Sequence, residues 1–138
     1  MSKRLTPRLL AAAALLAVLF AFRLPAANTL AAGATINVTT ATDEFNVSAN
    51  GTCSLREAIK AANNTAGDDN ITFKAGVTGT INLGEPLPNL NNNVKIQGPS
   101  AYLLTVQPDG AASSSVFFVK SGVTATISGL TITKGDRT

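Results

Sequence analysis

The fold is decided by two short segments, Val94-Lys95-Ile96-Gln97-Gly98 and Ala125-Thr126-Ile127-Ser128-Gly129, which share the pattern apolar–polar–Ile–polar–Gly. They lie 31 residues apart, and two other strand-like segments, 103–106 and 116–119, lie between them. A return to the same motif after three short strands is what each coil of a parallel β-helix requires. No Asn-Gly or Asp-Gly pair forms a two-residue turn between adjacent strand-like segments, so a hairpin-built sandwich or meander is disfavoured.

The same alternation of short apolar runs and turn residues continues on both sides of this repeat. Many short strands separated by Gly, Asn, Pro and Ser predict an all-β architecture. The segments at 71–73, 80–83 and 87–90 would form the preceding, shorter coil. A further strand is expected at the start of residues 35–42, where Ile36 and Val38 alternate with polar residues. The other predicted strands are 94–97, 103–106, 116–119, 124–127 and 130–133.

One helix is predicted before the strands, from about residue 55 to residue 63, after a polar loop at 43–52. Ser54 and Glu57 stand three apart, which is the spacing of a capping box. An amphipathic helix in this place can cover the open end of a stack of coils, which would otherwise expose core side chains and unpaired strand edges. The residues assigned to this structural cap are Cys53, Ser54, Leu55, Arg56, Glu57, Ile59 and Ala62, with Leu55, Ile59 and Ala62 on the apolar face and Arg56 and Glu57 binding the backbone or each other.

The N-terminus has the features of a signal peptide, assigned to residues 1–34. Lys3, Arg4 and Arg8 precede an apolar run over 9–22, and Ala32-Gly33-Ala34 fits cleavage before Thr35. The apolar run is shorter than the roughly 20 residues that span a bilayer, so an uncleaved membrane anchor is the less favoured alternative. Residues 35–69 then hold the first strand, the loop and the capping helix, and residues 70–138 hold the first coils.

The charge of the mature chain excludes one class of partner. Four of the 11 basic residues lie within 1–34, so seven remain against eight acidic residues and the net charge is −1. No basic cluster follows residue 34, and we expect no nucleic-acid binding. The chain contains no His, and its single Cys53 cannot form an intramolecular disulfide; we expect Cys53 to be a small buried apolar residue.

The segment from Cys53 to Ile59, followed by Ala61-Ala62-Asn63, closely resembles the C-S-L-R-E-A motif of bacterial exported proteins with the pectin-lyase-like fold. The resemblance implies a right-handed, single-stranded parallel β-helix, of which this chain would hold the N-terminal coils. It also implies continuation over many more coils, so we expect a truncated N-terminal fragment of a larger repeat protein. Further matching segments are 67–73, 80–83, 96–99 and 126–132.

No catalytic, cofactor-binding or metal-binding residue is assigned. Asp68, Asp69 and Asn70 could suggest calcium, but such residues are equally typical of a turn after a helix, and the turn is the favoured interpretation. The Asn-rich stretch 89–93 is read as a polar turn, with Asn stacking between coils as an alternative.

The sequence therefore predicts a secreted or cell-surface protein with a structural or adhesive function. Its expected partners are extracellular polysaccharide or other cell-surface components, and its only membrane association is through the export signal. Two alternatives stay open: a polysaccharide lyase or glycoside hydrolase, and a non-catalytic carbohydrate-binding module. The second would need exposed aromatic rings, and because Phe117 and Phe118 are neighbours, one of them must point outward.

Overall fold

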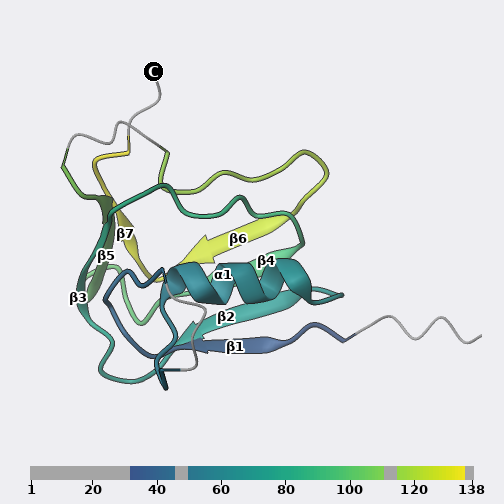
Figure 1. Cartoon of the computed structure of the whole chain (residues 1–138), viewed down its shortest axis with the longest axis horizontal. Coiled ribbons are helices and arrows are strands. Elements are labelled where there is room, and N and C mark those ends of the chain that lie inside the picture. Colours follow the sequence, from purple (N-terminus) through teal and green to yellow (C-terminus); the bar gives the residue numbers. More distant parts are fainter. Residues whose placement is uncertain (1–31, 46–49, 111–114, 136–138) are drawn as a thin grey trace, which may run out of the picture.

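The computed structural model describes residues 32–45, 50–110 and 115–135, so most of the predicted signal peptide lies outside the described residues. The chain is mainly β, with parallel strands in two sheets and one short helix (Figure 1). The elements in chain order are β1 (Thr35–Val38), α1 (Leu55–Asn64), β2 (Asp69–Phe73), β3 (Gly79–Leu83), β4 (Val94–Gln97), β5 (Leu104–Pro108), β6 (Ala125–Ser128) and β7 (Thr131–Ile132).

The larger sheet, which we call sheet A, contains four strands in the order β1-β2-β4-β6, and every pairing in it is parallel. Its register places one isoleucine from each strand in a single row: Ile36, Ile71, Ile96 and Ile127. The side chains of Ile71 and Ile96 are fully buried in the core. The predicted partnership of the two repeat segments is therefore confirmed, since β4 and β6 pair in parallel with Ile96 opposite Ile127.

The smaller sheet, sheet B, contains β3, β5 and β7, again all parallel (Figure 1). The chain visits the two sheets in turn: β2 is followed by β3, β4 by β5, and β6 by β7. Between β3 and β4, Leu90 forms an isolated parallel bridge with Val119, which lies between β5 and β6. Successive passes of the chain are therefore stacked on each other in the same order.

The core lies between these elements because the apolar residues of each strand occupy alternate positions. In β5, Leu104 and Val106 are buried while Thr105 and Gln107 are partly exposed. In β3, Ile81 and Leu83 are buried and Asn82 between them faces solvent. This period of two directs one face of each strand into a shared interior.

The glycines of the two repeat segments meet directly. A Cβ atom at Gly98 would overlap the carbonyl group of Gly129, and one at Gly129 would overlap the carbonyl group of Gly98. Gly129 also has φ +67°, a conformation that L side chains rarely adopt. The Gly that ends each repeat is thus required by the close approach of two stacked turns.

Two predicted strands are wrong. Residues 116–119 form no strand and contribute only the single bridge at Val119. Val116 is buried and Phe117 packs partly against the core, so two successive side chains turn inward and the alternation that a strand needs is lost. The segment expected at 87–90 likewise forms no strand and contributes only Leu90 to the same bridge, whereas each of the other strands predicted after residue 70 overlaps an observed one.

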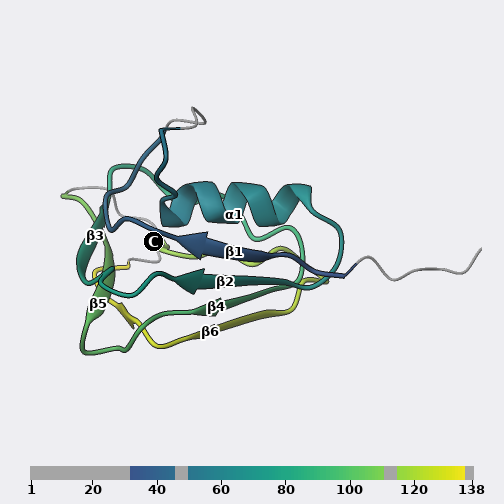
Figure 2. The ribbon, with the colours of Figure 1, turned by 90° about the horizontal axis from the view of Figure 1, so that it is seen from below.

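Helix α1 covers the β1 end of sheet A (Figure 2). It packs against β1 and β2, and Leu55, Ile59 and Ala62 are buried in the same core cluster as Val38 and Ile71. The observed bounds, Leu55–Asn64, extend the predicted helix by one residue.

Candidate functional site

The site is built on the start of helix α1, which the sequence fixes locally. The Ser54 hydroxyl accepts the N–H of Glu57, with 3.2 Å between Oγ and N. The Glu57 carboxylate in turn accepts the N–H of Ser54 at 2.8 Å. Both halves of the predicted capping box are present, and two backbone N–H groups that the helix cannot pair are thereby satisfied.

Arg56, the second residue of the helix, carries its guanidinium group into the interior. Its Nε and Nη2 atoms donate to the two carboxylate oxygens of Asp43, each at 2.8 Å, and the side chains of both residues are only 4% exposed. Nη1 donates to the Pro86 carbonyl and Nη2 also donates to the Glu85 carbonyl, each at 2.7 Å. A planar, bidentate group of this kind is the geometry in which arginine binds a carboxylate most strongly.

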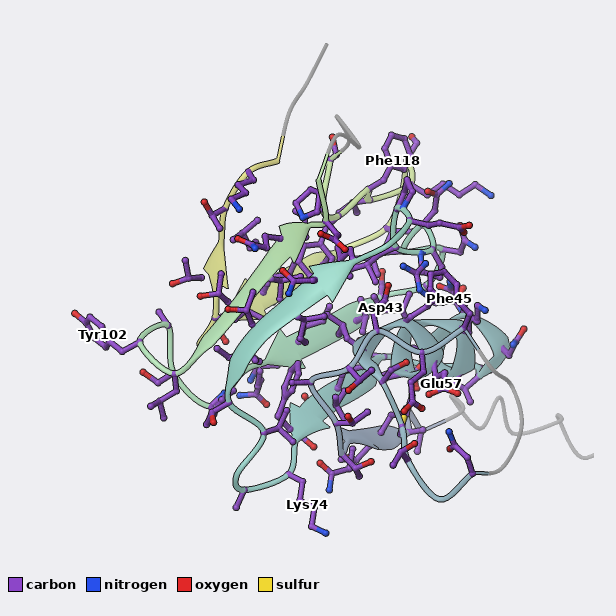
Figure 3. The ribbon with its side chains drawn as sticks, turned by 60° about the vertical axis from the view of Figure 1, so that its left-hand side comes forward. Asp43, Phe45, Glu57, Lys74, Tyr102 and Phe118 are labelled. Carbon is purple, nitrogen blue, oxygen red and sulfur yellow. The ribbon has the colours of Figure 1, made fainter. Side chains whose placement is uncertain are left out.

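An aromatic ring completes the surroundings of this guanidinium group. The Arg56 Cζ atom lies 4.4 Å from the centre of the Phe45 ring, a cation–π contact. Asp43 also accepts the N–H of Gly84 at 3.2 Å. Asp43 and Phe45 both lie over the start of the helix in Figure 3. Arg56 therefore ties together three segments: the loop after β1, the helix, and the loop after β3.

The other end of the helix is held by the Asn-rich stretch. The Asn92 amide nitrogen donates to the carbonyl groups of Ala62, Asn63 and Thr65, at 3.2, 3.2 and 2.8 Å. These carbonyls lie in the last turn of the helix or just beyond it, where carbonyls lack intrahelical partners. The side chain of Asn63 donates to the Asn89 carbonyl and accepts the Asn91 N–H. The stretch 89–93 is thus more than a polar turn, because it connects the helix to the following pass of the chain.

Cys53 lies just before the helix, partly buried against the core, with a free thiol. Burial raises the pKa of the Cys53 thiol, and the negative charges of Glu57 and Glu44 raise it further. The thiolate, which is the nucleophilic form, is therefore disfavoured at neutral pH.

All seven residues assigned from the sequence to the capping helix lie at one end of the molecule. Two further residues, Asp43 and Asn92, hold this helix in place and could not be identified from the sequence. The polar loop predicted at 43–52 suggests no partner for Asp43, and the Asn-rich stretch predicts only a turn at Asn92. The signal for Asp43 was weak: it is 13 residues from Arg56, with no periodic pattern between them. The signal for Asn92 was the concentration of Asn itself, since Asn carries both a donor and an acceptor for backbone groups.

The acidic pair Asp68 and Asp69 contributes to the same region of the fold. Asp68 accepts the side-chain amide of Asn93 at 3.0 Å. Asp69 is buried at the start of β2, where it accepts the Ala34 N–H and the Thr65 hydroxyl. Within residues 32–45, 50–110 and 115–135, no group of three or more Cys, Asp or Glu side chains is placed to hold a metal ion.

Comparison of the chain with family models, with curated proteins and with solved structures gave no match. In the part of the chain that the structure describes, no helix has the length and apolar character needed to cross a membrane.

Proposed function

We propose that this chain forms the helix-capped end of a right-handed parallel β-helix that is exported and acts as a structural or adhesive scaffold, secreted or on the cell surface. The observation that carries the proposal is the set of groups to which the buried Arg56 guanidinium donates hydrogen bonds. Its bonds run to a structural carboxylate, Asp43, and to two backbone carbonyls, so its charge stabilises the junction between cap and strands. Glu57 is likewise bound to a backbone N–H.

Two features of the structure support the β-helix, together with a general rule of handedness and the resemblance in sequence. The chain passes from sheet A to sheet B, then through the segment of the Leu90–Val119 bridge, and back to sheet A. The isoleucines of sheet A are aligned in register from β1 to β6. Connections between parallel strands of one sheet are right-handed in nearly all proteins, which favours a right-handed coil. The resemblance to the C-S-L-R-E-A motif points to the same architecture.

The scaffold function is tested by exposing extracellular polysaccharides to the purified protein. We expect no change in polymer length and no new unsaturated or reducing ends, with heat-unfolded protein as the matched control. Shortening of a polymer by the folded protein alone would contradict the scaffold function and favour the lyase or hydrolase alternative. Detection of the protein outside the cytoplasm, by fractionation of the cells that express it, tests the export part separately.

Non-catalytic carbohydrate binding is a second candidate, because two aromatic side chains project into solvent. Tyr102 is 99% exposed at the tip of the turn before β5, and Phe118 is 57% exposed (Figure 3). Exposed rings of this kind can stack on a sugar face. Retention on insoluble polysaccharide should fall in Tyr102→Ala and Phe118→Ala if binding occurs, and should not change in Lys74→Ala, an exposed non-aromatic control. Equal retention of all three variants would remove this candidate.

A further inference from the structure

The outward face of sheet A carries two rows of polar side chains. The register that aligns the isoleucines of this sheet also aligns the residues on either side of them, which point to the opposite face. One row is Thr35, Asn70, Lys95 and Thr126, and the other is Asn37, Thr72, Gln97 and Ser128. Each of these side chains is exposed or half-exposed, and all but Lys95 end in a hydroxyl or an amide group. The four strands lie side by side in Figure 2, so each row crosses the sheet with a spacing of about 4.8 Å.

The first of these rows lines a hollow in the surface. The hollow has a volume of about 480 Å³ and lies at the start of β2, β4 and β6. Its polar lining includes Asn70, Lys95 and Thr126 on the strands, and Asp68 and Asn93 in the loops before them. A volume of this size is in the range of ordinary small-molecule sites.

The hollow contains hydrogen-bonding groups that the fold does not use. Oδ1 of Asn70 is buried, and no donor in the described part of the chain bonds to it. A buried acceptor without a donor is unfavourable, so a ligand that donates to this atom gains stability. Lys95 is the register partner of Asn70, and its exposed, flexible side chain can move aside to admit a donor. Among the described residues the only ion pair joins Arg56 to Asp43, so the Lys95 ammonium group is available to a ligand.

These groups favour a neutral sugar over a charged ligand. The Asn70 amide offers an acceptor, the Lys95 ammonium offers donors, and the Thr126 hydroxyl offers both. Neighbouring hydroxyl groups of a sugar ring each donate and accept, so one ring can bind all three side chains. An ionised carboxylate or sulfate group could accept from Lys95, but it could not donate to Asn70, and the Asp68 carboxylate in the same hollow would repel it.

We infer that the outward face of sheet A binds a neutral polysaccharide, with one sugar unit in the hollow at Asn70, Lys95 and Thr126. The inference rests on the carbohydrate-binding candidate of the proposed function, and it places the binding on the sheet instead of on Tyr102 and Phe118. The two rows contain no aromatic residue, so a single sugar unit binds weakly through hydrogen bonds. A polymer lying along the rows binds more tightly, because each contact raises the effective concentration of the next.

The test measures retention of the full chain on insoluble polysaccharides. Cellulose and mannan are the neutral polymers, and cross-linked polygalacturonate is the acidic comparison. We expect retention on a neutral polymer, and the double variant Lys95→Met with Thr126→Val should lower the apparent affinity about tenfold, because two hydrogen-bonding side chains are lost. Thr105→Val is the matched control and should have no effect, since Thr105 is a half-exposed threonine of sheet B. Circular dichroism should show all variants folded, because the changed side chains are exposed or half-exposed.

The outcomes separate this inference from the proposed function. Full retention of the double variant would overturn the inference and leave carbohydrate binding elsewhere on the chain standing. Absence of retention of the unaltered chain on every polymer would overturn both. Stronger retention on polygalacturonate than on cellulose and mannan would overturn the assignment of a neutral sugar.

Nuclear magnetic resonance gives a second readout on the unaltered chain. The probe is cellopentaose or mannopentaose, according to the polymer that retains the chain. The side-chain amide resonances of Asn70 should shift as the oligosaccharide is added, whereas those of Asn82, an exposed amide of sheet B, should not. Absence of a shift at Asn70, or equal shifts at both residues, would overturn the inference without any substitution.

Discussion

At the scale of single residues, the cap depends on a charge placed where water cannot reach it. The Arg56 guanidinium and the Asp43 carboxylate are both almost fully buried, and removing either charge alone leaves the other without its partner. Such a pair is costly to bury, but it is far more costly to break once it is buried. The pair therefore specifies how the loop after β1 sits on the helix.

Replacing Arg56 with Met should destabilise the protein by about 3–5 kcal/mol, because Asp43 loses its charged partner and two carbonyls lose the donors that Arg56 supplies. The measurement is urea unfolding followed by circular dichroism. Lys74→Met, which removes an exposed positive charge, is the matched control and should change the free energy of unfolding by less than about 0.5 kcal/mol. Equal effects of the two substitutions would show that the buried pair does not hold the cap.

The partly buried thiol of Cys53 gives a pH-dependent prediction. Because its pKa is raised in the folded state, the unfolded chain loses the thiol proton first as the pH rises. The contribution of the thiol to stability is therefore fully present below the ordinary thiol pKa and declines as the pH rises from that value toward the folded pKa. Iodoacetamide should also alkylate folded Cys53 more slowly than a small-molecule thiol at pH 8. A Cys53→Ala variant should not show the decline, and alkylation as fast as that of the free thiol would contradict the prediction.

Some of these contacts between single residues could be predicted from the sequence, and others could not. The capping box was predictable because Ser54 and Glu57 are three residues apart and meet in any helix that starts there. The bond from Arg56 to the Pro86 carbonyl joins residues 30 apart and depends on how one pass of the chain lies on the next. No local rule contains that information, so the sequence could predict that Arg56 binds the backbone but not which carbonyls it binds, nor that Asp43 is its ion-pair partner.

At the scale of elements, helix α1 is fixed at both ends by different means. Its start is fixed within its own sequence, and its end is fixed by Asn92, which lies in the loop before β4. The helix itself was predictable from its apolar spacing and its cap. The strand predicted at 116–119 is wrong because a run of apolar residues does not by itself establish the alternation that a strand needs. Val116 and Phe117 both turn toward the core.

Replacing Asn92 with Ala should destabilise the protein by about 1–3 kcal/mol, because three carbonyls near the helix end lose one shared donor. Asn91→Ala provides a control of the same residue type one position earlier, since Asn91 takes part through its main-chain N–H, which Ala retains. Thermal unfolding of the two variants, compared with the unaltered protein, measures the difference. If Asn91→Ala is as destabilising as Asn92→Ala, the side-chain amide of Asn92 does not stabilise the end of the helix.

At the scale of the whole molecule, the arrangement follows from stacking equivalent residues of successive passes. Isoleucine lies against isoleucine in sheet A, and Gly98 lies against Gly129 at the turn that follows. The repeat of the pattern in the sequence predicted this parallel pairing, because strands that alternate between the same faces return to the same neighbour. The sequence did not predict that the third face of each pass would be reduced to the single Leu90–Val119 bridge, since the length of a strand there depends on side-chain packing.

The most direct test of this stacking is disulfide formation between β4 and β6 in a Cys53→Ala background. Lys95 and Thr126 are exposed register partners, so Lys95→Cys with Thr126→Cys should oxidise readily to an intramolecular disulfide. Lys95→Cys with Ser128→Cys, two residues out of register, should remain reduced under the same conditions, because diagonal neighbours in a sheet are about 7–8 Å apart. Preferential oxidation of the 95/128 pair, or of neither pair in folded protein, would contradict parallel in-register stacking of the two repeats.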